Sequence, residues 1–474
     1  MNTDITKQAL AQSKNLMHPF HGFDMVAHEG PFIIDRAHGM HVYDSEGKGY
    51  LDAVGGMWCT QIGTGRKEMA DAIAEQVMKC NYSNPFVDNA NTAQTALAAK
   101  LAELAPGDLN HVFLTCGGST ANEAAFRLVQ LYNVYRGKPE KRALICREDA
   151  YHGTTLLTSS LGGRAAPNWD ESWYLDSDGN NVLDIHKVSS PNYFHHGDGL
   201  SEAEFGEKLY QEVVDKIAAL GGPDKVAAFL AEPIIGAGGV VPPPANYLKR
   251  VWEYCQANDI LYWSDEVVTG FGRLGHFFAS EAEFGITPDI IISAKGLTSA
   301  YAPLGACIFS DKIWNVLAEA DQGRIFNMGY TYSGHPISCA AALKNIEIIE
   351  RENLLEHVHE VGPYFMEQLQ TLRDLEIVGD VRGSKLMACV EIVKNNKTME
   401  FLGDEINFAV GHMVGDAAQN HGLIVRAVAN MSIMSPPLII TKAEVDEVVA
   451  KLRKAIVEVT DILRAEGHLA DEAA

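Results

Sequence analysis

Short apolar runs alternate with longer segments of helical periodicity through the middle of the chain. The apolar runs occupy residues 111–115, 142–146, 226–231, 260–264, 290–293 and 306–309, and helical patterns follow at 121–135 and 247–258. Runs with so little alternation are typical of strands buried on both faces, as in a mostly parallel sheet covered by helices. We therefore expect an α/β core with right-handed crossovers.

The two ends of the chain carry a different pattern. Between residues 30 and 52, short strand-like runs are broken by glycines, which predicts a small antiparallel ribbon. A long helical pattern at 337–353 precedes strand-like runs at 376–393 and 423–427 and a final amphipathic helix at 442–466. We expect residues 1–75 and 335–474 to form a smaller α+β domain beside a large domain of residues 76–334.

Charge and cysteine usage exclude several classes of protein. The 474 residues include 38 Lys or Arg and 62 Asp or Glu, a net charge of −24, and no basic run offers a site for a phosphate backbone. We therefore expect no nucleic-acid partner. The eight cysteines are scattered singly and the histidines show no ligand spacing with carboxylates, so we predict neither a disulfide framework nor a metal site.

No targeting or membrane segment is indicated. Residues 1–20 lack the apolar core of a signal peptide, and the most apolar stretch, 226–241, is short and contains Glu232 and Pro233. We expect a cytoplasmic protein with reduced thiols and no membrane partner.

Residues that can carry chemistry follow three of the predicted strands. Cys116–Thr120 (CGGST) turns from a strand into a helix, where backbone N–H groups and the helix N-terminus can hold a phosphate. The same residues can cap the helix with no ligand present. Asp265 and Lys295 end two other apolar runs. Taken singly, they are better explained as a paired buried acid and a lysine that extends to solvent.

The combination of these three features is more informative than any one of them. An anion-binding turn, a strand-end acid and a strand-end lysine match the phosphate, the protonated ring nitrogen and the aldehyde of pyridoxal phosphate. Ligands of open α/β sheets bind outside the carboxyl ends of the strands, which is where these residues fall. We therefore predict a pyridoxal-phosphate site.

Seven motifs in order make the chain similar to the class III (ω-type) aminotransferases, pyridoxal-phosphate enzymes of fold type I. They are GGMWCTQIGTGR (55–66), GGSTANEAAFR (117–127), YHG (151–153), AEPIIGAGGVVPPPANYL (231–248), DEVVTGFGRLG (265–275), ISAKGLTSAYAPLGA (292–306) and GYTYSGHPISCAAAL (329–343). The resemblance spans nearly the whole chain. It implies a large domain, with a mostly parallel sheet sandwiched by helices, and a smaller α+β domain.

The resemblance also assigns roles to residues. It implies that Lys295 binds the cofactor as a Schiff base and then moves a proton between the substrate Cα and the cofactor C4′, while Asp265 pairs with the pyridinium nitrogen. The further cofactor contacts that it implies are Gly118 and Ser119 on the phosphate, Tyr151 stacked on the ring, His152 beside it, Glu232 near the hydroxyl and Thr331 from a neighbouring subunit. We therefore expect a homodimer or a dimer of dimers with shared active sites.

The phosphate-binding segment departs from the family's usual N-S-G-S-E-A. Gly117 replaces a serine and Thr120 replaces the glutamate. Since threonine can still cap a helix, we expect the turn to survive with a looser hydrogen-bond pattern.

Three positions bear on the substrate. The resemblance implies that Arg426 binds the carboxylate of a keto acid, and that Trp58 and Phe86 form walls of the pocket. The simpler interpretations are a surface arginine and a core aromatic. Relatives that act on γ-aminobutyrate or ornithine carry an acid where this chain has Ala237. This pattern resembles the pyruvate-using branch, with taurine, β-alanine or a related ω-amine as donor.

Other functions on the same fold stay open. An aminomutase or a dialkylglycine-type decarboxylase would use the same cofactor, and a non-enzymatic descendant would only bind it. The presence of Lys295, Asp265 and Tyr151 disfavours the last of these.

Overall fold

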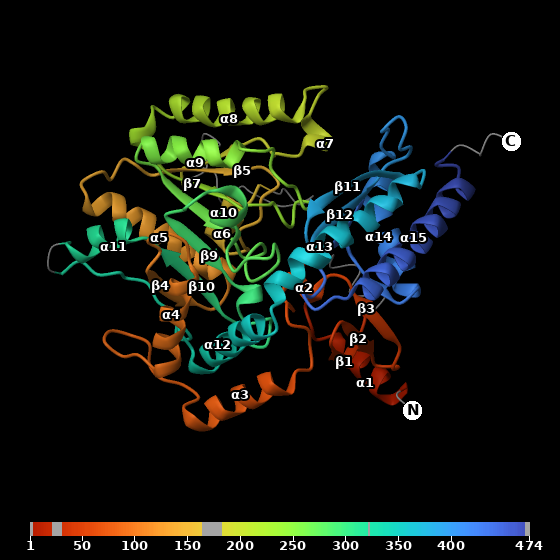
Figure 1. Cartoon of the computed structure of the whole chain (residues 1–474), viewed down its shortest axis with the longest axis horizontal. Helices are drawn as coiled ribbons and strands as arrows, with labels where there is room; N and C mark the ends of the chain where they lie inside the picture. Colours follow the sequence, from red (N-terminus) through yellow and green to blue (C-terminus); the bar gives the residue numbers. More distant parts are fainter. Residues whose placement is uncertain (1–2, 21–30, 164–182, 321–322, 470–474) are drawn as a thin grey trace.

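The computed structural model describes residues 3–20, 31–163, 183–320 and 323–469. Its largest sheet has seven strands and lies in the left half of the molecule as drawn in Figure 1. Its strand order is β4-β10-β9-β8-β7-β5-β6. The strands are β4 (His111–Thr115), β5 (Ala143–Arg147), β6 (Ile185–Val188), β7 (Val226–Ala231), β8 (Leu261–Asp265), β9 (Ile290–Ser293) and β10 (Gly305–Phe309). All pairings are parallel except those of β10 with β4 and β9. The expected mostly parallel sheet is thus confirmed.

Both faces of this sheet are buried, which explains why its strands show so little alternation. On β8, Leu261 and Trp263 pack in one apolar cluster with residues of α5 (Gly118–Tyr135). Tyr262, between them, packs in another with residues of α8 (Glu202–Ala219) and α9 (Tyr247–Ala257). Because successive side chains of a strand point to opposite faces, a strand between two helical layers must be apolar throughout.

Further helices connect these strands and cover the rest of the molecule. They are α1 (Thr3–Ser13), α2 (Gly55–Trp58), α3 (Lys67–Lys79), α4 (Thr92–Leu104), α6 (Leu156–Leu161), α7 (Tyr193–His196), α10 (Ala279–Phe284), α11 (Asp311–Ala318), α12 (Pro336–Arg351), α13 (Leu354–Gln370), α14 (Asp404–Asn420) and α15 (Lys442–Ala465). None of the helices in the described ranges is long and apolar enough to cross a membrane.

Among the described residues there are also two smaller sheets, and the first of them brings together the first and last parts of the chain. One has the order β1-β2-β3-β13, from β1 (Ile34–His38), β2 (His41–Asp44), β3 (Gly49–Asp52) and β13 (Leu423–Ile424). The other has the order β11-β12-β15-β14, from β11 (Val378–Ser384), β12 (Met387–Ile392), β15 (Met431–Met434) and β14 (Arg426–Val428). The parallel pairing of β3 with β13 places the red and blue segments of Figure 1 side by side. The boundaries at residues 75 and 334 stay a prediction.

A buried ion cluster connects the second small sheet to the loop after β7. Glu391 of β12 accepts from Arg382 of β11 at 2.5 Å and lies 2.6 Å from His195 Nε2 on α7. The Arg382 Nε donates to the carbonyl of Gly239 at 2.9 Å. Burial raises the pKa of Glu391, but the His195 hydrogen bond and the Arg382 charge outweigh it and bring the pKa to about 2.

Candidate active site

One pocket at the carboxyl ends of the central strands gathers most of the predicted site residues. It has a volume of about 580 Å³, part of which is open to solvent, and is lined by Trp58, Gly118, Ser119, Asn122, Tyr151, His152, Gly153, Glu232, Ala237, Asp265, Val267, Val268, Ala294 and Lys295. Asp265 is the last residue of β8, and Lys295 follows the neighbouring strand β9 by two residues. Because the strands are parallel, residues far apart in the sequence meet at one edge of the sheet.

Lys295 combines an unusual backbone conformation with a depressed basicity. Its φ of +42° lies in the left-handed region, and its Nζ lies 4.9 Å from the centroid of the Trp58 ring. Burial lowers the pKa of the Lys295 amine, and the charges of Asp265 and Glu232 offset only part of this effect. A lysine with a lowered pKa is more readily the neutral amine that attacks a carbonyl.

Asp265 is held by donors on both of its carboxylate oxygens. Its Oδ2 accepts from Asn122 Nδ2 at 2.9 Å and lies 2.8 Å from His152 Nδ1, while its Oδ1 accepts from the Val267 backbone N–H at 3.1 Å. These bonds fix a buried carboxylate in one orientation, as pairing with a cationic ring nitrogen would require. Glu266, the next residue, points away and accepts from the backbone N–H groups at the start of α10.

Thr120, one of the two departures from the family pattern, stabilises the predicted phosphate-binding turn through hydrogen bonds. The Thr120 Oγ1 donates to the Gly117 carbonyl at 2.8 Å and accepts from the Cys116 N–H at 3.1 Å. Thr120 therefore bonds back to the turn and is not the N-terminal cap of α5, which was the expected role. A Cβ at Gly117 would meet nothing within 4 Å, so that departure leaves open space.

Glu232 positions the segment that carries Tyr151. Its two carboxylate oxygens accept from the Tyr151 N–H at 3.0 Å and from the Gly236 N–H at 2.8 Å. Burial raises the pKa of Glu232. Gly153 ends the YHG motif that begins with Tyr151. Its φ is +135°, and a Cβ at this position would lie 2.4 Å from Ser119 Oγ. Glycine is therefore required for Tyr151 and Ser119 to face the same pocket.

Arg426, the first residue of β14, lies close enough to the pocket to act on Lys295. Its charge lowers the Lys295 pKa, and burial lowers the pKa of Arg426 itself. No carboxylate of the described residues forms a salt bridge with it, and Tyr151 is the group that raises its pKa. Ala237, where an acid would neutralise such an arginine, lines the pocket and is 8% exposed.

Besides Arg426, which does not line the pocket, two predicted residues lie outside it. Phe86 is 44% exposed and packs against Gly329, and the carbonyl of Thr331, also exposed, accepts from Tyr82 OH at 3.1 Å. Both belong to a surface with other exposed apolar side chains, including Val87 and Tyr332. This placement is compatible with the expectation that Thr331 acts from a neighbouring subunit.

Asn122 is a pocket residue that the sequence analysis missed. It is fully buried, it holds Asp265, and its Nδ2 also donates to the His152 carbonyl at 2.8 Å. Its signal was its spacing, since Asn122 lies one helical turn beyond Gly118 and so shares the face of α5 that meets the strand ends. Within the described residues, its Oδ1 and the Nε2 of His152 are buried without a hydrogen-bond partner.

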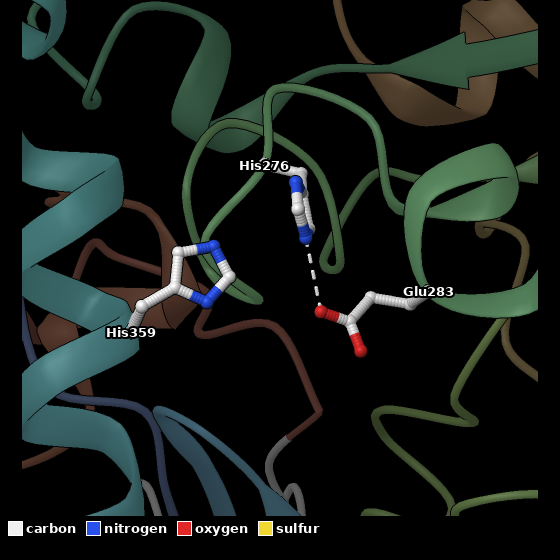
Figure 2. Close-up of side chains that lie close together, drawn as sticks. All are labelled: His276, Glu283 and His359. Atoms are coloured by element: carbon white, nitrogen blue, oxygen red, sulfur yellow. Dashed lines mark hydrogen bonds and ion pairs between the residues drawn. The ribbon is translucent and has the colours of Figure 1, made fainter.

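One cluster elsewhere has the composition of a metal site. His276, Glu283 and His359 each offer one ligand atom within 4.8 Å of the others, and His276 Nε2 bonds to Glu283 Oε1 at 3.0 Å (Figure 2). However, the two ring nitrogens of His359 face the Gly275 carbonyl at 2.9 Å and Lys385 Nζ at 2.8 Å. An ammonium group beside the cluster opposes a second cation, so we assign no metal to it.

The residues of the pocket fit pyridoxal phosphate. An amine with a lowered pKa, a carboxylate held by donors and a glycine turn at the start of α5 correspond to its aldehyde, ring nitrogen and phosphate. The buried, unpartnered atoms of Asn122 and His152 are further evidence of a polar ligand, because buried polar groups are rarely left without a partner.

Comparisons of the sequence and of the structure with known proteins all point to one family. Residues 25–456 match the family described as aminotransferase class-III. The chain is 39% identical over 463 residues to the putrescine–pyruvate aminotransferase of Pseudomonas aeruginosa, which covers 96% of this chain and 98% of that protein. It is 38% identical over 445 residues to the diaminobutyrate–2-oxoglutarate transaminase of Halomonas elongata, 92% of each chain. The omega transaminase of Pseudomonas jessenii, solved in complex with PMP, superposes with a TM-score of 0.90 at 33% identity, covering 96% of this chain and 99% of the other.

Proposed function

Since this chain belongs to the class III aminotransferases, which depend on pyridoxal phosphate, we propose that it moves an amino group from a small ω-amino donor to pyruvate. The donor class comprises taurine, β-alanine and related ω-amines. The products are an aldehyde or semialdehyde and L-alanine, formed by a ping-pong mechanism. The observation that supports this acceptor is Arg426, a partly buried guanidinium with no salt bridge to a described carboxylate. It lies close to a pocket whose wall has Ala237 in place of an acid.

The charge of the pocket supports this choice of acceptor. A free guanidinium binds the carboxylate of a keto acid through two parallel hydrogen bonds, which a neutral donor does not need. An acid at position 237 would neutralise Arg426 when the donor is bound, and alanine cannot do so. The putrescine–pyruvate relative also uses pyruvate, whereas the diaminobutyrate relative uses 2-oxoglutarate. The acceptor therefore needs a direct test.

The residues of the pocket have separate roles in the proposed reaction. Bound pyridoxal phosphate would supply an electrophilic carbon and a ring that withdraws electrons from the reacting bond. Lys295, whose pKa is lowered by burial, supplies the amine that would engage that carbon and would then move the proton of the donor's Cα. Asp265, oriented by Asn122 and His152, stabilises positive charge at the ring nitrogen. Glu232 holds the backbone of Tyr151, whose side chain would stack on the cofactor ring.

A second copy of the chain completes the site in this proposal. Thr331 and Phe86 lie on an exposed surface away from their own pocket, as residues that serve a neighbouring subunit would. We expect a homodimer, or a dimer of dimers, in which Thr331 reaches the neighbour's phosphate-binding turn.

The test is a half-reaction followed by the visible absorption of the holoenzyme. Taurine, β-alanine, γ-aminobutyrate, putrescine, an arylalkylamine and L-alanine are added one at a time without any keto acid. A productive donor bleaches the band, and pyruvate restores it with formation of one equivalent of L-alanine. Restoration by 2-oxoglutarate but not by pyruvate would overturn the proposed acceptor. Release of carbon dioxide, or isomerisation of the amine without a keto acid, would indicate a decarboxylase or an aminomutase.

A further inference from the structure

The loop that carries Lys295 is held in a conformation that its own sequence does not favour. Lys295, Ser299 and Ala300 all have left-handed backbones, with φ of +42°, +48° and +63°. Non-glycine residues adopt this region only where the surrounding structure imposes it. A set of contacts outside the pocket must therefore fix the direction in which the Lys295 side chain leaves the backbone.

Asn345 of α12 supplies these contacts from one side. It is fully buried, and its Nδ2 donates to the carbonyls of Gly296 at 2.8 Å and Leu297 at 3.1 Å. Its Oδ1 accepts from Ser299 Oγ at 2.6 Å, and Ser299 Oγ in turn accepts from the Ile62 N–H at 3.2 Å. The reversed amide would place its oxygen against two carbonyl oxygens, so these bonds allow one orientation of the side chain.

Packing around Gly296 restricts the loop further. A Cβ placed on Gly296 would lie 2.2 Å from Gln61 Nε2 and 2.9 Å from Phe271 Cβ. The loop therefore cannot move toward Gln61 and Phe271. Without Asn345, three of the four residues that follow Lys295 would lose their bond to α12, so the loop could shift relative to that helix.

We propose that Asn345 is a positioning residue, which directs the Lys295 amine into the pocket by holding the loop at Gly296, Leu297 and Ser299. Asn345 does not line the pocket, so its effect on the reaction passes through the backbone next to Lys295. The proposal rests on the family assignment, which makes Lys295 the residue that engages the cofactor, and not on the choice of donor or acceptor. Displacement of a reacting group by about 1 Å can cost about 100-fold in rate.

The test replaces the amide with an apolar side chain of similar size, Asn345→Leu, in the full holoenzyme. We expect kcat to fall by about tenfold or more, with KM for donor and acceptor within about twofold of the wild-type values. We also expect the pH midpoint of the visible absorption band to shift by about half a unit or more, because that midpoint reports the geometry at the lysine nitrogen. The matched control is Asn133→Leu on α5, where a buried amide likewise donates to a backbone carbonyl.

The outcomes separate positioning from general stability. Asn133→Leu should lower the Tm while leaving kcat and the pH midpoint unchanged. If Asn345→Leu lowers the Tm in the same way but also leaves both values unchanged, Asn345 is only structural and the proposal is wrong. Should Asn345→Leu fail to fold, Ser299→Ala removes two bonds of the same network, those to Asn345 and Ile62, and must also shift the pH midpoint; an unchanged midpoint in that variant would overturn the proposal. The midpoint is measured without substrate, so a wrong donor or acceptor cannot be mistaken for failure of this proposal.

Discussion

Replacing Arg426 with leucine should damage the use of pyruvate far more than the use of a neutral acceptor. A guanidinium–carboxylate pair makes two charged hydrogen bonds, and removing one partner of such a pair costs about 2–5 kcal/mol. Arg426 is only partly buried, so the lower part of this range applies, about 2–3 kcal/mol. At about 1.4 kcal/mol for each factor of ten, kcat/KM for pyruvate should fall by about 30- to 150-fold.

The assay compares two acceptors with one amine donor. Values of kcat/KM are measured for pyruvate and for propanal, which lacks a carboxylate, in the wild type, Arg426→Leu and Arg426→Lys. The ratio of the two acceptors isolates the contribution of the carboxylate from any general damage to the pocket. Arg426→Lys keeps the charge without the paired geometry and should fall between the other two. An equal loss on both acceptors would refute the reasoning, because it would show that Arg426 supports the pocket without binding the carboxylate.

Three further predictions test separate parts of the molecule. Ala237→Glu should raise KM for pyruvate by about tenfold, because the new carboxylate competes for the free guanidinium; steady-state kinetics with pyruvate and 2-oxoglutarate would show it. Gly153→Ala should weaken cofactor binding by about tenfold or more, since its Cβ would lie 2.4 Å from Ser119 Oγ; a titration of the cofactor-free protein measures this, and unchanged affinity would contradict it. Glu391→Gln should lower the Tm at pH 7. The pKa of Glu391, about 2 against an ordinary 4.5, contributes about 3 kcal/mol to the free energy of unfolding. This contribution is present above pH 4.5 and is lost as the pH falls toward 2, so the difference in Tm between wild type and Glu391→Gln should narrow below pH 4.5.

Strands and strand-end residues were predictable because their signals are local. The run at 226–231 is β7, and the rule that ligands bind at the carboxyl ends of strands led to both Asp265 and Lys295. Strand β6 was missed because its four residues, Ile-His-Lys-Val, are half polar and pack on a neighbour that lies far away in sequence. The alternation of side chains left Asp265 and Glu266 as competing candidates, and the structure resolves them by giving each carboxylate its own set of donors.

The residues that sequence reasoning missed are asparagines that act across long gaps in the chain. Asn122 holds a carboxylate 143 residues away, and Asn345 bonds to carbonyls 48 and 49 residues away. A buried asparagine in a helix gives no local signal of its partner, because its role depends on which backbone groups the fold places opposite it. The family resemblance assigned the residues expected to contact the cofactor, and it did not extend to the residues that hold those side chains and loops in place.

The pairing of β3 with β13 has a consequence for synthesis of the protein. Leu51 pairs with Leu423, and these residues are separated by 423 − 51 = 372 positions. At about 5–20 residues per second, the ribosome needs roughly 20–70 seconds to make the second strand after the first. During that time the free edge of β3 is open to other strands, including those of neighbouring nascent chains. We expect the newly made chain to depend on chaperones until residues 423–424 emerge, even though the finished protein has no such exposed edge at this position.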